Sequence, residues 1–128
     1  MKKLVIAFTI LTTSIFASSI KELNSSNFKS TINSSKPTLV KFYSNNCQAC
    51  ILMAPHYKRV SREFASKIRY AELNIDNYPN LRQKYQVVAT PTTILFKNGK
   101  EVDRAIGGYN YKYLKSWAKN IINYFKTH

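Results

Sequence analysis

Two cysteines, Cys47 and Cys50, are the only cysteines of the 128-residue sequence, and they directly follow an apolar segment. Residues at positions i and i+3 of a helix lie on one face, with Cβ atoms about 5–6 Å apart. A disulfide accepts Cα separations of about 4.4–6.8 Å, so this spacing lets the two sulfurs bond and separate again. The sequence therefore predicts a dithiol that cycles with a disulfide.

The two sulfurs are expected to have different roles. If a helix begins at Cys47, this sulfur faces unpaired backbone N–H groups and the positive end of the helix dipole, and both favour the thiolate. Cys47 is therefore predicted to be the attacking thiolate. Cys50 lies one turn further along the helix and is predicted to be covered by it, so that it resolves the mixed disulfide from within.

Two other uses of the cysteines are less favoured. A structural zinc site needs four ligands, and His56 and His128 do not form a second ligand pair with sensible spacing. A purely structural disulfide over so short a loop removes little entropy from the unfolded chain. We therefore expect no metal and no bound cofactor, only a redox-active disulfide between Cys47 and Cys50.

The first residues are typical of a secretory signal peptide. Lys2 and Lys3 precede an apolar run of about 13 residues and then small residues that suit signal peptidase. The run is shorter than the roughly 18–20 residues of a membrane span, although an uncleaved anchor is the alternative. We expect residues 1–19 to direct export to the periplasm or another extracytoplasmic compartment. Residues 20–128 then form a single small domain, and in exported proteins cysteines generally serve disulfide chemistry.

The rest of the sequence alternates between strand and helix patterns. Asn98 and Gly99 indicate a tight hairpin turn, and Asn110 is a predicted helix cap. This order predicts an α/β fold with a mixed sheet and helices on both faces. The expected strands are 19–23, 38–43, 68–75, 92–96 and 100–106, and the expected helices lie within 24–35, 50–67 and 79–85 and after residue 110.

These segments together resemble the thioredoxin family from about Ile20 to Phe125. The similar pieces are LVKFYSNNCQAC, Pro55 in the following helix, LNID, ATPTTILFKNGKEV and Gly107. The resemblance implies the thioredoxin fold and thiol-disulfide oxidoreductase activity. It also implies a cis Thr90–Pro91 bond in a loop beside the cysteines, where relatives pair their backbone with the substrate peptide.

Two charged residues depart from the family pattern. Lys41 stands where the family has a buried aspartate, and Glu72 stands where it has a lysine on the next strand. We expect a partly buried Lys41–Glu72 ion pair, since either charge alone would be costly there. An ammonium favours a nearby thiolate, and Glu72 or a neutral Lys41 would accept the proton that Cys50 loses. The alternative is that Lys41 reaches solvent and has no chemical role.

The net charge of +14 raises the question of partners. Lysines and arginines are scattered along the sequence without a contiguous run, which argues against nucleic acid. The expected partners are exported proteins with thiols or disulfides and a membrane redox protein that recycles the cysteine pair, and the chain is expected to be a monomer. The competing hypothesis is a peptide-binding module whose cysteines are idle. The direction of electron flow stays open at this point.

Overall fold

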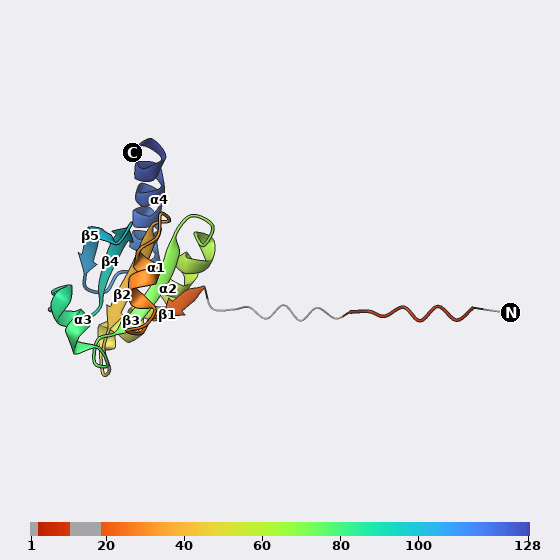
Figure 1. The fold of residues 1–128 in the computed structure, drawn as a ribbon, viewed down its shortest axis with the longest axis horizontal. Helices are drawn as coiled ribbons and strands as arrows, with labels where there is room; N and C mark the ends of the chain where they lie inside the picture. Colours follow the sequence, from red (N-terminus) through yellow and green to blue (C-terminus); the bar gives the residue numbers. More distant parts are fainter. Residues whose placement is uncertain (1–2, 11–18) are drawn as a thin grey trace.

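The computed structural model describes residues 3–10 and 19–128. Residues 3–10 are exposed and form no helix or strand (Figure 1). Residues 1–2 and 11–18 of the predicted signal peptide lie outside the described residues. Within the described ranges, no helix has the length and apolar character needed to cross a membrane.

Residues 19–128 fold around a mixed five-stranded sheet with the strand order β1-β3-β2-β4-β5 (Figure 1). The strands β1 and β2 both run parallel to β3, whereas β4 runs antiparallel to its neighbours β2 and β5. The predicted α/β class with a mixed sheet is therefore confirmed. The strand bounds are β1 Ile20–Glu22, β2 Thr38–Tyr43, β3 Arg69–Asn74, β4 Thr92–Lys97 and β5 Lys100–Ile106.

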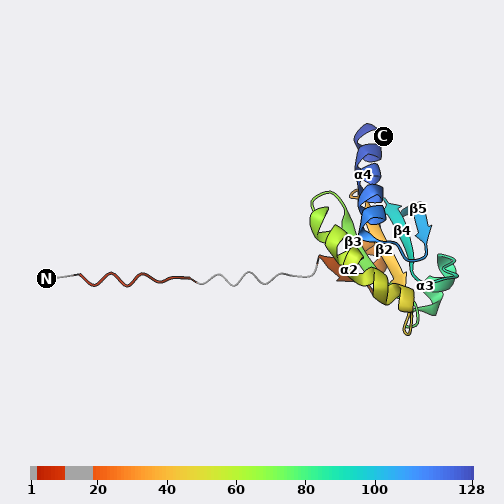
Figure 2. The same cartoon turned by 180° about the vertical axis from the view of Figure 1, so that it is seen from behind.

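Helices cover both faces of the sheet. The long helices α2 (Gln48–Glu63) and α4 (Tyr111–Thr127) pack on one face, which Figure 2 shows in front of the strands. The short helices α1 (Phe28–Ile32) and α3 (Pro79–Lys84) lie on the other face. Each face buries its own apolar core, because successive side chains of a strand point to opposite sides of a sheet.

The central strand β2 illustrates this alternation. Leu39 belongs to the core under α2 and α4, whereas Val40 and Phe42 belong to the core under α1. Lys41 points to the same face as Leu39, where its Nζ lies 4.8 Å from the ring centroid of Tyr57 on α2. The strand therefore places one buried cation directly beneath the helix that carries the cysteines.

Several local predictions can be compared with the observed elements. Asn98 and Gly99 have φ angles of 53° and 80°, as a two-residue hairpin turn requires. The Asn110 side chain accepts a 3.0 Å hydrogen bond from the Tyr113 N–H and caps α4 as predicted. The helix after the cysteines ends at Glu63 rather than Lys67. The segment after β1 contains only the five-residue helix α1.

An asparagine turn precedes α1. The side chain of Asn24 accepts hydrogen bonds from the backbone N–H groups of Ser26 and Asn27, at 2.9 and 3.0 Å. An asparagine that bonds to its own following backbone forms a turn before the helix. The turn is followed by Asn27, the N-cap residue of α1, whose side chain makes no capping hydrogen bond to the helix.

Candidate active site

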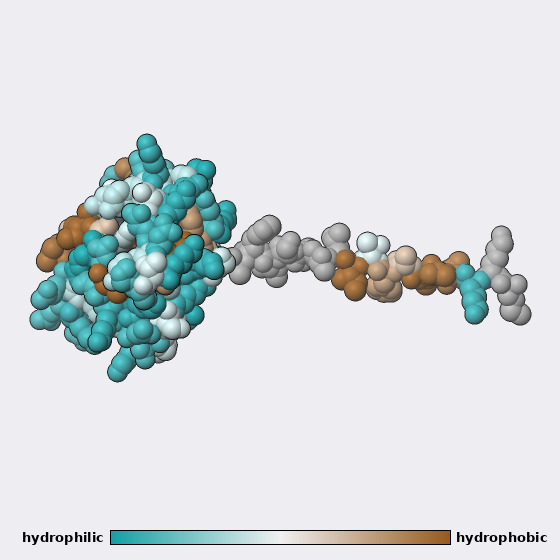
Figure 3. Space-filling model, turned by 90° about the horizontal axis from the view of Figure 1, so that it is seen from above, coloured by the Kyte–Doolittle hydropathy of each residue, from teal (hydrophilic) through white to brown (hydrophobic). Residues whose placement is uncertain are grey.

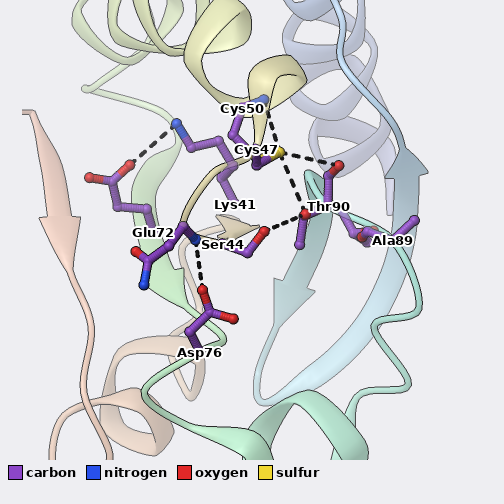
Figure 4. Close-up of a disulfide and its surroundings, with 10 residues drawn as sticks. Lys41, Ser44, Cys47, Cys50, Glu72, Asp76, Ala89 and Thr90 are labelled. Carbon is purple, nitrogen blue, oxygen red and sulfur yellow. Dashed lines mark hydrogen bonds and ion pairs between the residues drawn. A yellow bond between two sulfur atoms is a disulfide. The ribbon is translucent and has the colours of Figure 1, made fainter.

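Cys47 is the N-cap residue of α2, and its sulfur takes the place of the usual capping oxygen. The Cys50 N–H donates to Cys47 Sγ at 3.1 Å, and the two Cα atoms lie 5.2 Å apart in a Cys47–Cys50 disulfide (Figure 4). Cys47 is partly exposed, whereas Cys50 is only 6% exposed. The helix therefore covers one sulfur and leaves the other accessible from solvent.

The loop that ends in Pro91 lies beside Cys47. The Thr90–Pro91 peptide bond is cis, and Pro91 is buried. Cys47 Sγ is 3.5 Å from both the carbonyl oxygen and the hydroxyl oxygen of Thr90 (Figure 4). The structure thus brings Thr90 and Pro91 together with a cysteine that lies more than forty residues earlier in the sequence.

The loop between β2 and α2 is held by groups at the end of β3. The Asn45 N–H donates to Asp76 Oδ2 at 2.7 Å, and the Asn74 side chain donates to Asn45 Oδ1 at 3.0 Å. The next residue, Asn46, has a positive φ of 56°. The carboxyl ends of parallel strands meet at one edge of a sheet. The polar residues at the ends of the parallel strands β2 and β3 were therefore the sequence signal that could have predicted this contact. Neither Asn45 nor Asp76 was predicted from the sequence to take part in the site.

Ser44 is a further residue of the site that was not predicted from the sequence. Its hydroxyl lies 2.7 Å from the Thr90 hydroxyl, which in turn contacts Cys47 Sγ. The two segments are joined only by folding, so local sequence patterns carry no information about their contact. Figure 4 shows the Thr90 hydroxyl between the other two groups, with one contact to Ser44 and another to the Cys47 sulfur.

Lys41 and Glu72 form the expected ion pair. They are register partners on β2 and β3, and Lys41 Nζ lies 3.3 Å from Glu72 Oε2. Lys41 is only 4% exposed, so the alternative in which its ammonium reaches solvent is wrong. The buried end of this pair also faces the Tyr57 ring, which attracts a cation through its negative face.

A second carboxylate extends this pair toward the sheet edge. Glu22 on β1 is the register partner of Glu72, and its Oε1 accepts a 2.8 Å hydrogen bond from the Tyr43 hydroxyl. Partial burial raises the pKa of Glu22, and the neighbouring Glu72 raises it further, while the Tyr43 hydroxyl and Lys41 act in the opposite direction. The row Glu22, Glu72 and Lys41 therefore links the sheet edge to its buried centre.

A shallow hollow of about 310 Å³ adjoins the first turn of α2. Leu52 on its rim is 63% exposed, and the hollow lies between α2 and the loop that precedes α4. His56 on α2 contributes to the same wall. The lining residues are Ala49, Leu52, Met53, His56, Gly108, Tyr109 and Asn110.

The part of the chain that the structure describes contains no group of three or more His, Cys, Asp or Glu side chains arranged to hold a metal ion. The chemistry of the site is that of its sulfur atoms and of the charged and hydroxyl groups around them. These groups can stabilise a thiolate, move a proton and hold a peptide backbone next to Cys47 Sγ.

Comparison with known proteins identifies the family. The sequence profile of the thioredoxin family matches residues 19–120. The chain is 33% identical to the thioredoxin of Rickettsia bellii over 91 residues, which cover 71% of this chain and 87% of that protein. It is 35% identical to a thioredoxin of Mycobacterium tuberculosis over 97 residues, which cover 76% and 84% of the two chains.

A solved structure shows the same fold. The thioredoxin of Malassezia sympodialis superposes with a TM-score of 0.75 at 21% identity, over 81% of this chain and 91% of that one. The matched region contains all five strands and the Cys47–Cys50 pair. The chain therefore belongs to the thioredoxin family and is a protein disulfide oxidoreductase.

Proposed function

We propose that this oxidoreductase acts outside the cytoplasm on the thiols and disulfides of exported proteins. In this proposal, Cys47 is the attacking thiolate and Cys50 resolves the mixed disulfide. A membrane redox protein then recycles the pair. The proposal combines the geometry of the cysteines with the character of the N-terminal segment.

The difference in exposure between the two cysteines is the observation that supports their proposed roles. Cys47 is partly exposed and its sulfur accepts the Cys50 N–H at the start of α2, where the helix dipole favours a negative charge. Cys50 is only 6% exposed, so its sulfur is much less accessible to a protein substrate. A bulky protein disulfide therefore reaches Cys47 first.

In the reductive direction, the Cys47 thiolate attacks one sulfur of a substrate disulfide. This step forms a mixed disulfide and releases the other substrate sulfur as a thiolate. Cys50 then loses its proton and attacks Cys47 Sγ, which forms the Cys47–Cys50 disulfide and frees the second substrate thiol. The substrate gains two electrons and the enzyme loses two, so a separate electron donor must restore the dithiol. The oxidative direction reverses every step.

Thr90 and Pro91 are proposed to bind the substrate backbone. The Thr90 carbonyl lies 3.5 Å from Cys47 Sγ, at the rim of the exposed sulfur. An extended substrate segment placed there can add to the loop by backbone hydrogen bonds, as in other cases of strand addition. Recognition through backbone groups suits an enzyme that handles many sequences.

Lys41 and Glu72 are proposed to modulate Cys50. They lie on the sheet face that α2 covers. Lys41 contacts the ring of Tyr57, which lies on α2, the same helix that carries Cys50. An ammonium in a poorly solvated place favours a thiolate, and a carboxylate next to it can take up a proton. The buried hydroxyl of Thr93, the register partner of Lys41 on β4, has no hydrogen-bond partner among the described residues.

The N-terminal segment supports export. Lys2 and Lys3 precede an apolar run, and the large apolar side chains among residues 4–10 of that run are 72–88% exposed. Figure 3 contrasts this apolar segment with the largely hydrophilic surface of the folded domain. Such a segment is what the export machinery recognises, and export separates the enzyme from cytoplasmic electron donors.

The activity is tested by reduction of insulin with the wild type, Cys47→Ser and Cys50→Ser. The wild type should precipitate insulin chains, and both variants should be inactive. Cys50→Ser should accumulate a mixed disulfide with the substrate at Cys47, because nothing resolves it. A mixed disulfide on Cys50 in the Cys47→Ser variant, formed at the wild-type rate, would contradict the assigned roles.

The location is tested separately with alkaline phosphatase fused behind the full chain. This reporter is active only where its own disulfides form, outside the cytoplasm. Active reporter in the full-length fusion, and inactive reporter when residues 1–19 are deleted, would support export. Equal activity of the two fusions would contradict it.

A further inference from the structure

We infer that Ser44 is a positioning residue that directs the Thr90 hydroxyl toward Cys47 Sγ and thereby stabilises the Cys47 thiolate after reduction. The inference rests on the proposed role of Cys47 as the attacking thiol. It adds a third side chain, from the end of β2, to the two segments that already meet at the sulfur.

The hydroxyls of Ser44 and Thr90 can bond to each other and to Cys47 Sγ at the same time only if each hydroxyl donates in a defined order. The Ser44 and Thr90 hydroxyl oxygens are 2.7 Å apart, and the Thr90 hydroxyl lies 3.5 Å from Cys47 Sγ (Figure 4). A hydroxyl has one hydrogen to donate and two lone pairs that accept. When Thr90 donates to the sulfur, its oxygen accepts the Ser44 hydrogen. Ser44 thus occupies the oxygen lone pair and leaves the Thr90 hydrogen for Cys47.

The Thr90 residue offers Cys47 two opposite interactions. Its carbonyl oxygen, 3.5 Å from Sγ, accepts a hydrogen bond from a neutral thiol and favours that form. Its hydroxyl favours the thiolate when it donates, and so does the Cys50 N–H at 3.1 Å. The orientation of one hydroxyl therefore shifts the balance between thiol and thiolate. Ser44 sets that orientation.

Partial burial strengthens this effect. Ser44, Thr90 and Cys47 are each partly buried, so water competes less for their hydrogen bonds than at an open surface. A charged acceptor also strengthens each bond in a chain of donors. The chain is therefore strongest when Cys47 is a thiolate and weaker when it is part of the disulfide.

This difference between redox states has a consequence for the reduction potential. Two electrons break the Cys47–Cys50 bond, Cys47 keeps a negative charge and Cys50 takes up one proton. Interactions that stabilise the Cys47 thiolate stabilise the reduced enzyme and raise its reduction potential. Ser44 is thus expected to make the pair more oxidising than it would be with alanine at this position.

The experiment measures the Cys47 thiolate in the reduced full chain. The probes are the pH dependence of alkylation by iodoacetamide, with the modified cysteine identified by mass, and equilibration with glutathione. Ser44→Ala should lower the thiolate-to-thiol ratio of Cys47 at fixed pH by about threefold to tenfold. At a pH where Cys47 is mostly thiolate in both proteins, the equilibrium constant with glutathione should change by the same factor, and a tenfold change corresponds to about 30 mV.

Three further variants separate this role from a merely structural one. Thr90→Val should lower the ratio as well, and Ser44→Ala should have no further effect in the Thr90→Val background. Ser44→Thr keeps a hydroxyl and should retain the wild-type profile. The matched control is Ser26→Ala, which removes a hydroxyl that bonds to the Asn24 side chain rather than to Thr90.

Two results would overturn the inference. One is an unchanged pH profile and potential in Ser44→Ala. The other is an effect of the same size with and without the Thr90 hydroxyl, since Ser44 would then act by another route. Faster alkylation of Cys50 than of Cys47 in the wild-type enzyme is a different result, because it would refute the proposed role of Cys47 itself.

Discussion

Lys41 on β2 and Glu72 on β3 are register partners whose ammonium and carboxylate groups lie 3.3 Å apart, with Lys41 only 4% exposed. Removing one buried charge leaves the other without compensation, whereas removing both does not. Lys41→Met should therefore destabilise the fold by about 1–3 kcal/mol, with the loss reduced by the partial exposure of Glu72. Urea unfolding measures this loss.

The same variant tests the effect on Cys50. Without the ammonium, alkylation of Cys50 in the reduced enzyme should require a higher pH. The double variant Lys41→Met/Glu72→Gln is the control, and it should recover stability relative to Lys41→Met alone. An unchanged pH profile of Cys50 in Lys41→Met would remove the proposed modulating role while leaving the ion pair as a structural feature.

Glu22 predicts a pH dependence of stability. Burial raises its pKa above the usual 4.5, so the folded state binds its proton more tightly than the unfolded state. The stabilising contribution of this group is complete below pH 4.5 and is lost as the pH rises through the raised pKa. Glu22→Gln keeps an acceptor for Tyr43 but cannot ionise. The stability of the wild type relative to this variant should fall as the pH rises above 4.5.

Urea unfolding at a series of pH values measures this difference. Glu101→Gln on β5 is the control, because it removes one carboxylate at the opposite edge of the sheet. A constant difference between wild type and Glu22→Gln, from below pH 4.5 to neutral pH, would contradict the coupling of Glu22 to its buried neighbours.

Leu52 provides a test of the hollow beside the disulfide. Its side chain is 63% exposed, so Leu52→Asp should leave the fold intact. A charge there should weaken contacts with a protein substrate and lower the rate of insulin reduction by about fivefold, equivalent to roughly 1 kcal/mol. Reduction of a small aromatic disulfide, which needs only the sulfurs, should be unaffected.

Val102→Asp is the matched control for Leu52→Asp. Val102 is 45% exposed on β5 and lines a separate hollow against α4. If both aspartate variants slow insulin reduction equally, the effect is one of net charge and the hollow beside α2 has no part in substrate binding.

Tyr57 connects the helix of the cysteines to the sheet. Its buried hydroxyl lies 3.0 Å from the Leu39 carbonyl and 2.8 Å from the Ala71 carbonyl, to which it donates. Tyr57→Phe should cost about 1–2 kcal/mol of unfolding free energy, because it removes a buried donor from two acceptors. Tyr124→Phe, at a side chain that is 49% exposed, should change the midpoint of urea unfolding far less.

The sequence was most informative where the physical signal is local. The two-residue spacing between Cys47 and Cys50, the Asn98–Gly99 turn and the Asn110 cap each depend on a few neighbouring residues, and each is found as predicted. The boundaries of α1 and α2 were less accurate. The Asn24 side chain competes for backbone groups at the first helix, and the capping sulfur of Cys47 is not among the common helix caps.

The contacts around the cysteines were the hardest to predict. Ser44 and Thr90 are 46 residues apart, and Asn45 meets Asp76 from another strand. Neither contact follows from propensity or periodicity, because both depend on which strands are neighbours. The Lys41–Glu72 pair was accessible to prediction because the resemblance to thioredoxins placed both residues at matching depth. Glu22 lies outside the segments on which that resemblance rests.

The position of β1 at the edge of the sheet constrains how the N-terminus can be processed. This strand has three residues and pairs, within the described part of the chain, only with β3, yet it supplies the carboxylate that accepts a hydrogen bond from the Tyr43 hydroxyl. A peptidase that trimmed past Glu22 would remove both the edge strand and an acidic group coupled to the centre of the sheet. Cleavage that keeps β1 whole must therefore leave the new amino terminus at Ile20 or at a residue before it.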